Sequence, residues 1–334
     1  MDHSIHNKQS PQFFIDGVLR GDVAVLSRAI TLTESTSEDH KKLARQVLEG
    51  IIDKTGNSFR LGITGVPGVG KSTFIESFGK EIITRGHKLA VLAVDPSSNK
   101  SKGSILGDKT RMEELSVMEN VYVRPSPSSG TLGGVARASY ETILLCEAAG
   151  FDFIIIETVG VGQSEVTVSK ITDFFLLLML AGAGDELQGI KRGIMEMADS
   201  VVITKADGNN IQKARAAKMQ YESAMHLLQP LESGFTPKVE TCSSLENKGI
   251  TEVLDIIENY RRHVTANNFF LHKRKQQQRE LLFNFLEEKL KEKFYTHPSV
   301  IKSIKELEEK SSEKGFISFG LANDLIENVF KNLH

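Results

Sequence analysis

The sequence has few cysteines, no excess of either charge and no long apolar run. Its 334 residues include two cysteines, Cys146 and Cys242, without the Cys-x-x-Cys or Cys/His spacing of a zinc site or disulfide framework. Its 41 basic and 43 acidic residues nearly cancel, which argues against bulk binding to nucleic acid or to a membrane surface. The longest apolar run, residues 174–181, is too short to cross a bilayer, so we interpret it as a buried strand.

The N-terminal residues also lack the common targeting patterns. They contain neither an apolar signal core nor an Arg-rich amphipathic transit pattern. Together with the scarcity of cysteine, this favours a reducing cytoplasm as the expected compartment.

The hydrophobic pattern changes twice along the chain. Apolar residues first recur at helical spacing, and then short β-rich runs alternate with helical stretches. Such alternation predicts an α/β fold with a mostly parallel sheet sandwiched by helices. The last part has only helical spacing, which is typical either of a tail packed on its own domain or of an arm that contacts a second subunit. The predicted divisions are an N-terminal helical extension (1–57), a P-loop G domain (58–265) and a C-terminal helical arm (266–334).

Residues 65–72, Gly-Val-Pro-Gly-Val-Gly-Lys-Ser, match the Walker A pattern in the required context. They follow an apolar strand and precede an amphipathic helix, residues 72–85, that ends at Gly86. Glycines let backbone N–H groups surround phosphate oxygens, and the helix N-terminus adds positive potential. The loop therefore predicts binding of a nucleoside triphosphate. The expected phosphate-site residues are Gly65, Pro67, Gly68, Val69, Gly70, Lys71, Ser72 and Thr73.

Two acidic residues end predicted strands. Asp95 and Glu157 should emerge at the carboxyl edge of the sheet, where their carboxylates can hold Mg²⁺ or one of its waters. Ser72 would supply a further oxygen to the ion. The N–H of Gly160, three residues after Glu157, would contact the γ-phosphate. The alternative is that each acid merely caps the helix that follows it.

The segment Thr204-Lys205-Ala206-Asp207 resembles a base-reading loop. A carboxylate at Asp207 can accept from the adjacent N1–H and N2–H₂ donors of guanine, and the Lys205 stem can cover the base plane. Thr204 stands where an Asn is usual, so we expect weaker bracing between loops. A second loop, with Ser243, Ser244 and the backbone N–H of Leu245, could reach the guanine carbonyl. These features favour guanine over adenine.

Several longer segments together indicate a family. "GVPGVGKST", "AVDPSS", "SPSSGTLGGVAR", "AGAGDELQGIKRGI" and "TKAD", in this order, closely resemble the MeaB/ArgK-type GTPases, which include the methylmalonic aciduria type A protein. The resemblance implies a GTP-hydrolysing chaperone for adenosylcobalamin-dependent acyl-CoA mutases, chiefly methylmalonyl-CoA mutase. It also implies Mg²⁺ with GTP or GDP, and a homodimer joined through the C-terminal arm.

The resemblance assigns further roles residue by residue. Because no Gln directly follows Gly160, we expect slow intrinsic hydrolysis that the mutase accelerates. The implied catalytic and Mg²⁺ residues are Lys71, Ser72, Asp95, Asp108 and Glu157. The implied switch and partner residues are Arg111, Gln163, Asp185, Gln188 and Lys191.

Three other functions remain open at this stage. An ATP-dependent kinase would need a base for an acceptor hydroxyl, and the sequence indicates none. A nickel-metallochaperone-like GTPase would need Cys/His ligands that are not evident here. A structural dimer that binds GDP without cycling is the third. The chain also lacks a cobalamin-binding Asp-x-His-x-x-Gly motif, so we expect the cofactor to belong to the partner.

Overall fold

The computed structural model describes residues 10–94, 112–124, 132–158, 164–182, 192–314 and 319–331. They form two compact units, of which the first ends at Gln277 and the second begins at Gln278. This boundary falls inside helix α12 (Phe269–Thr296), whose first turns belong to the first unit. The domain boundaries expected from the sequence stay predictions.

A parallel sheet of seven strands forms the centre of the first unit, in the order β3-β2-β4-β1-β5-β6-β7. All neighbouring strands run in the same direction, so their carboxyl ends share one edge. The α/β fold with a parallel sheet is confirmed. The strands are β1 (Phe59–Gly65), β2 (Leu89–Val94), β3 (Val121–Arg124), β4 (Phe153–Thr158), β5 (Phe174–Leu180), β6 (Ser200–Thr204) and β7 (Lys238–Thr241).

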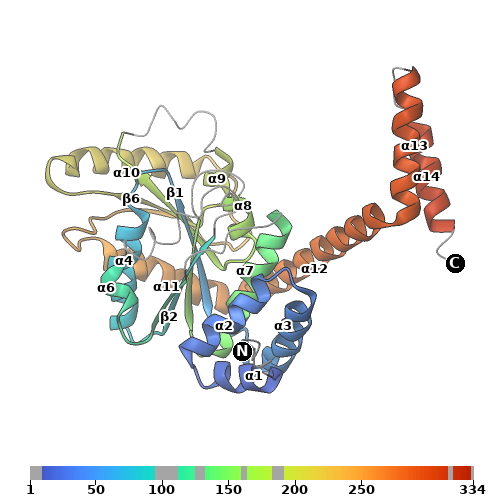
Figure 1. The fold of residues 1–334 in the computed structure, drawn as a ribbon. Coiled ribbons are helices and arrows are strands. Elements are labelled where there is room, and N and C mark those ends of the chain that lie inside the picture. The colour runs from blue at the N-terminus through green and yellow to red at the C-terminus, as the bar shows by residue number, and fades with distance from the viewer. Residues whose placement is uncertain are drawn as a thin grey trace. The chain divides into compact units, whose positions relative to one another are not determined.

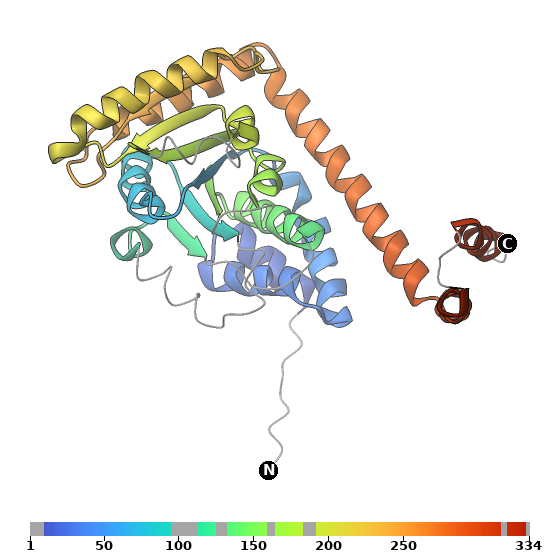
Figure 2. The same cartoon turned by 90° about the horizontal axis from the view of Figure 1, so that it is seen from above.

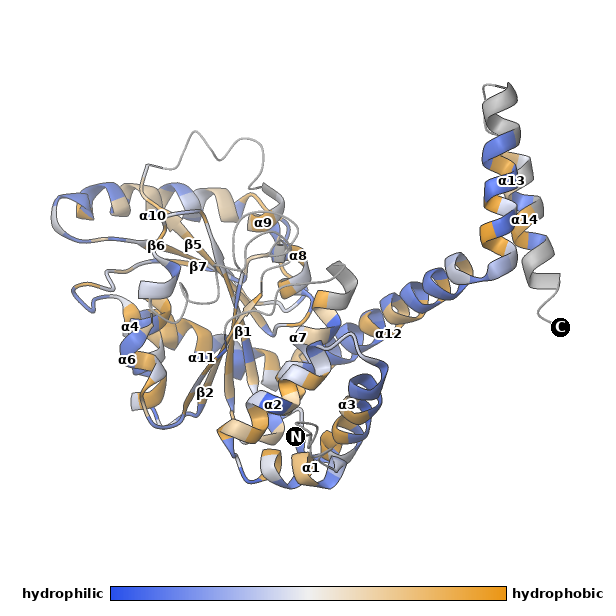
Figure 3. Ribbon diagram, viewed as in Figure 1, coloured by the Kyte–Doolittle hydropathy of each residue, from blue (hydrophilic) through white to orange (hydrophobic). Residues whose placement is uncertain are grey.

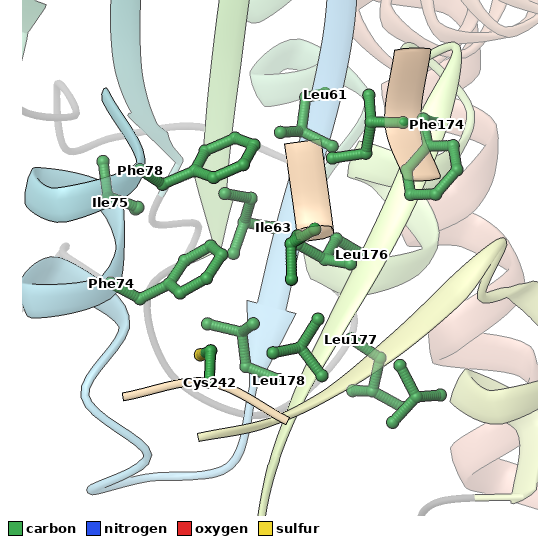
Figure 4. Packing of buried hydrophobic residues seen from close by; sticks show 14 of the residues in the cluster. Leu61, Ile63, Phe74, Ile75, Phe78, Phe174, Leu176, Leu177, Leu178 and Cys242 are labelled. Carbon is green, nitrogen blue, oxygen red and sulfur yellow. The ribbon is translucent and has the colours of Figure 1, made fainter. Parts of the chain in front are cut away.

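The central strands are apolar because helices cover both of their faces. β1, β2 and β4 are buried at every position, as expected for continuous apolar runs in a parallel sheet. Leu61 and Ile63 of β1 lie near Phe74 and Phe78, whose rings stack with centroids 5.2 Å apart (Figure 4). Full burial of each such side chain contributes about 1.5–3 kcal/mol.

Helices sandwich this sheet (Figure 1). α4, α6 and α11 pack on one side, and α7, α8 and α9 pack on the other, while α10 contacts β6 and β7. The expected helix after the Walker A loop is confirmed, with Gly86 in the left-handed conformation just after it. The bounds are α4 (Lys71–Thr84), α6 (Glu113–Ser116), α7 (Leu132–Ala148), α8 (Ser164–Ser169), α9 (Arg192–Met197), α10 (Ile211–His226) and α11 (Ile250–Ala266). Two short 3₁₀ turns are η1 (Ile52–Lys54) and η4 (Gly208–Asn210).

Three N-terminal helices pack against one another and against α7 (Figure 2). They are α1 (Pro11–Leu19), α2 (Val23–Glu34) and α3 (Glu38–Ile51). The carboxylate of Asp22 caps α2 by accepting from the N–H groups of Ala24 and Val25. Arg124, at the end of edge strand β3, pairs with Glu34 of α2. The helical extension is therefore bound to the edge of the sheet.

A cluster of buried charges lies at the amino edge of the sheet, and sequence reasoning did not find it. Arg60 pairs with Glu147 at 2.8 Å, and both side chains are almost fully buried. Arg274, in the first turns of α12, pairs with Asp173, the residue before β5. Nearby, the side-chain amide of Gln277 donates to the carbonyl oxygen of Thr172 at 2.7 Å. The beginning of α12 is thus fixed to the sheet.

The second unit is helical. It contains the rest of α12 together with α13 (Pro298–Lys314) and α14 (Phe319–Lys331), which pack on each other. Figure 3 shows mixed polar and apolar residues along α12, in contrast to the apolar strands. Leu282, Leu286 and Leu290 are 55%, 45% and 61% exposed and recur every four residues. Within the part of the chain that the structure describes, no helix combines the length and apolarity needed to cross a membrane.

Candidate nucleotide-binding site

The loop between β1 and α4 has the shape that a phosphate site requires. Gly65 ends β1 beside β5, and a Cβ atom there would lie 2.6 Å from the carbonyl oxygen of Leu178. Gly70 precedes α4 with φ +88°, a conformation that costs glycine little and other residues more. Because glycine has no side chain that could cap α4, the N–H groups of its first turn remain suited to an anion.

Lys71, Ser72 and Thr73 form the first turn of α4. The Nζ of Lys71 donates to the carbonyl oxygen of Gly65 at 3.1 Å, so the ammonium group lies over the loop. Ser72 is half-buried and Thr73 is exposed. The predicted phosphate residues are therefore brought together on one loop and one helix turn.

Glu157 lies at the carboxyl edge of the sheet. It is in register with Ile63 of β1 and Ala93 of β2, and it is 6% exposed. β4 continues for one residue beyond the predicted end, because Thr158 still pairs with Val94 of β2. Its hydroxyl also donates to the hydroxyl of Thr64 at 2.8 Å. The Ser72 hydroxyl and the Glu157 carboxylate both offer oxygen ligands, the type that Mg²⁺ prefers.

Several predicted residues lie outside the described residues, and their roles stay predictions. In the described ranges, no three His, Cys, Asp or Glu side chains come together in a way that could hold a metal ion. The residues outside these ranges are Asp95, Asp108, Arg111, Gly160, Gln163, Asp185, Gln188 and Lys191.

The loop after β6 is bonded directly to the phosphate loop. The hydroxyl of Thr204 donates to the carbonyl oxygen of Val69 at 2.8 Å, and the Nζ of Lys205 donates to that of Gly68 at 2.7 Å. Lys205 has φ +55°, and the Asn210 side-chain amide donates to its carbonyl oxygen at 2.7 Å. The hydroxyl of Thr204 therefore contributes to the contact between these loops. The expectation that it holds them less firmly than an asparagine would stays a prediction.

Asp207 is oriented by the loop after β7. The hydroxyl of Ser243 donates to Asp207 Oδ2 at 2.6 Å and accepts from the N–H of Glu246 at 3.1 Å. Ser243 is fully buried, so in this structure its side chain orients the carboxylate. The backbone N–H of Ala206 donates to the carbonyl oxygen of Cys242 at 2.9 Å, which joins the two loops. Guanine contact by Ser243, Ser244 and Leu245 stays a prediction.

Cys242, immediately before Ser243, is an unreactive neighbour of this site. Burial, reinforced by the negative charges of Glu240 and Asp207, raises the pKa of its thiol to about 12. Because the thiolate is the reactive form, this cysteine is suited to packing and not to covalent chemistry.

Comparisons with known proteins agree with this geometry. The family model described as "Methylmalonyl Co-A mutase-associated GTPase MeaB" matches residues 26–299, which include both the phosphate loop and the base loops. A probable GTPase of Mycobacterium tuberculosis is 49% identical over 305 residues, which is 91% of each protein. The mouse (Mus musculus) "Methylmalonic aciduria type A homolog, mitochondrial" is 46% identical over 347 residues, covering 100% of this chain and 83% of that protein. A crystal structure titled "LAO/AO transport system kinase" has a TM-score of 0.78 and 36% identity, covering 98% and 99% of the two chains.

Proposed function

The chain belongs to the MeaB family of methylmalonyl-CoA mutase-associated GTPases, and from this premise we propose that its GTP hydrolysis gates the loading and reactivation of a B12-dependent acyl-CoA mutase. The observation that carries the proposal is the family match over residues 26–299, within which the loop that contains Asp207 is bonded to the phosphate loop through Lys205. Methylmalonyl-CoA mutase is the proposed client, and adenosylcobalamin is proposed to be held by that client.

The proposed role of the phosphate loop is electrostatic. The backbone N–H groups and Lys71 would hold the β- and γ-phosphates and stabilise the negative charge that develops during phosphoryl transfer. Ser72 and Glu157, together with Asp95 and Asp108, would hold Mg²⁺. When bound, this ion neutralises phosphate charge. Positioning of the attacking water is assigned to the switch segments that contain Gly160 and Gln163.

The proposed role of the base loops is selection of guanine. Ser243 donates to one oxygen of Asp207, yet each carboxylate oxygen has a second lone pair available for the guanine N–H donors. Lys205 is fixed by its bond to Gly68, so that its stem can cover the base. The bond between Lys205 and Gly68 holds the base loop against the phosphate loop. A ligand that fills both loops, such as GTP or GDP, is therefore favoured over a smaller guanine compound.

We also assign the partner contacts to the predicted switches and to the arm. Arg111, Asp185, Gln188 and Lys191 would respond to the nucleotide and meet the mutase. The second unit would join two copies of the chain. The cytoplasm remains the compartment expected from the sequence.

The test is the rate of nucleotide hydrolysis by the full chain, alone and with the B12-dependent acyl-CoA mutase of the same organism. We expect slow GTP turnover that the mutase accelerates at least several-fold, and no comparable ATP turnover. The Lys71→Ala variant, which lacks the phosphate-binding charge, controls for contaminating activity. GTP turnover that ignores the mutase would remove the chaperone role, whereas ATP-dependent labelling of a substrate would favour the kinase alternative.

A further inference from the structure

Ser77 connects the phosphate end of the site to the base end. It lies on α4, six residues after Lys71. Its hydroxyl donates to the carbonyl oxygen of Ser244 at 3.2 Å, across 167 positions of sequence. Both residues are half-buried, so water competes only partly for this bond.

The loop that contains Ser244 is closed mainly by its own backbone. Ser243 and Lys248 exchange two backbone hydrogen bonds, of 2.9 and 3.0 Å. Gly249 follows with φ +76°, where a Cβ atom would lie only 2.2 Å from the carbonyl oxygen of Thr241. These contacts fix the shape of the loop, but a loop's internal bonds cannot fix its position relative to α4. The hydroxyl of Ser77 supplies such a positional contact.

We infer that Ser77 is a positioning residue for guanine selection. It holds Ser244, whose neighbour Ser243 in turn orients the Asp207 carboxylate. Thr204 and Lys205 bond the β6 loop to the phosphate loop. Ser77 adds a separate bond, between α4 and the loop after β7. The inference rests on the proposed function, in which Asp207 reads the base.

Replacement of the hydroxyl tests this inference. In Ser77→Ala we expect a fluorescent GDP analogue to dissociate about two- to tenfold faster, the effect of one lost hydrogen bond. The KM for GTP should rise by a similar factor while kcat stays near the wild-type value. Inosine triphosphate lacks the 2-amino donor, so it depends less on the orientation of Asp207. The preference for GTP over inosine triphosphate, measured as a ratio of kcat/KM values, should therefore fall.

Two matched variants separate positioning from general damage. Ser77→Thr keeps the hydroxyl and should restore the dissociation rate and the GTP preference. Thr84→Ala removes an exposed hydroxyl whose hydrogen bond lies within the same helix, to the carbonyl oxygen of Lys80 at 2.9 Å, and this variant should behave as wild type. Equal losses for both nucleotides in Ser77→Ala, or no change in either, would overturn the inference.

Asp207→Asn distinguishes this inference from the proposed function. If that variant does not change its preference from GTP to xanthosine triphosphate, the base assignment fails and the inference fails with it. If the preference changes while Ser77→Ala keeps wild-type dissociation and selectivity, only the role of Ser77 is overturned.

Discussion

At the scale of the residue, the proposed base recognition depends on the Asp207 carboxylate, which is hydrogen-bonded to a second side chain. Asp207 accepts from the buried hydroxyl of Ser243 at 2.6 Å. This hydrogen bond holds one oxygen of the carboxylate and so restrains rotation of the Asp207 side chain. The residue type at position 207 was evident in the sequence, but the partner that aims it was not.

Changing this carboxylate to an amide should change the preferred base. In Asp207→Asn the side-chain NH₂ meets the N–H donors of guanine, whereas xanthine presents an oxygen in place of the 2-amino group. We expect GTP binding to weaken by about 1.5–3 kcal/mol, or roughly 10- to 100-fold, and xanthosine triphosphate to become the better substrate. Steady-state kinetics with both nucleotides measures this.

The matched control is Asp255→Asn on α11, which removes an acid that pairs with Arg85 and should leave base preference unaltered. A wild-type preference in Asp207→Asn would show that another residue reads the base.

At the scale of the element, the first turns of α12 are held by buried charges. Arg274 donates to Asp173 Oδ2 at 2.6 Å and to the carbonyl oxygen of Ser58 at 2.9 Å. Asp173 also accepts from the backbone N–H of Arg60 at 2.7 Å, at the start of the central strand. Removing one member of such a pair leaves the other buried without its charge partner, which is more costly than losing the attraction itself.

The variant Arg274→Met should therefore reduce the free energy of unfolding by about 3–5 kcal/mol. Lys275→Met is the control, because Lys275 is the next residue of the same helix but is exposed, and its change should stay within about 0.5 kcal/mol. Denaturant unfolding of both variants, at low and high salt, provides the measurement. Equal stability of the two variants would mean that this cluster does not anchor α12.

At the scale of the whole molecule, the likeness to known proteins covers both units. The mouse relative is matched over 100% of this chain, and the kinase-titled crystal structure over 98%. Beyond Gln277, α12 exposes Leu282, Leu286 and Leu290 along one side. A row of leucines at this spacing favours a contact with another apolar surface, and in the proposed homodimer that surface belongs to the second copy of the chain.

Negative charge on the exposed leucines of α12 should separate the two chains of the proposed homodimer. We expect Leu286→Glu combined with Leu290→Glu to convert a dimer of the full chain into a monomer, measured by light scattering after size-exclusion chromatography. Lys291→Glu places the same charge on an exposed position beside the row and should leave the dimer intact. A dimer that survives the double change would assign the subunit contact to another surface.

The sequence by itself determined the elements and the type of site. Continuous apolar runs predict strands buried on both faces, as found for β2 and β4, and their alternation with helical stretches predicts a parallel sheet. The Walker A residues and Asp207 are recognisable because local spacing sets their geometry: a glycine-rich turn needs its glycines adjacent, and a helix N-terminus needs Lys71 and Ser72 in its first turn.

Only the tertiary structure decided which distant residues act together. Thr204 and Val69, and Ser243 and Asp207, meet because parallel strands bring loops from remote parts of the chain to one edge. Ser77 meets Ser244 because α4 lies beside one of these loops. Each of these residue types is common on surfaces, so no local pattern distinguishes a brace from a solvated hydroxyl. The buried charges of Arg60, Glu147, Asp173 and Arg274 were undetectable for the same reason. Their pairing depends on packing between elements, which sequence spacing does not record.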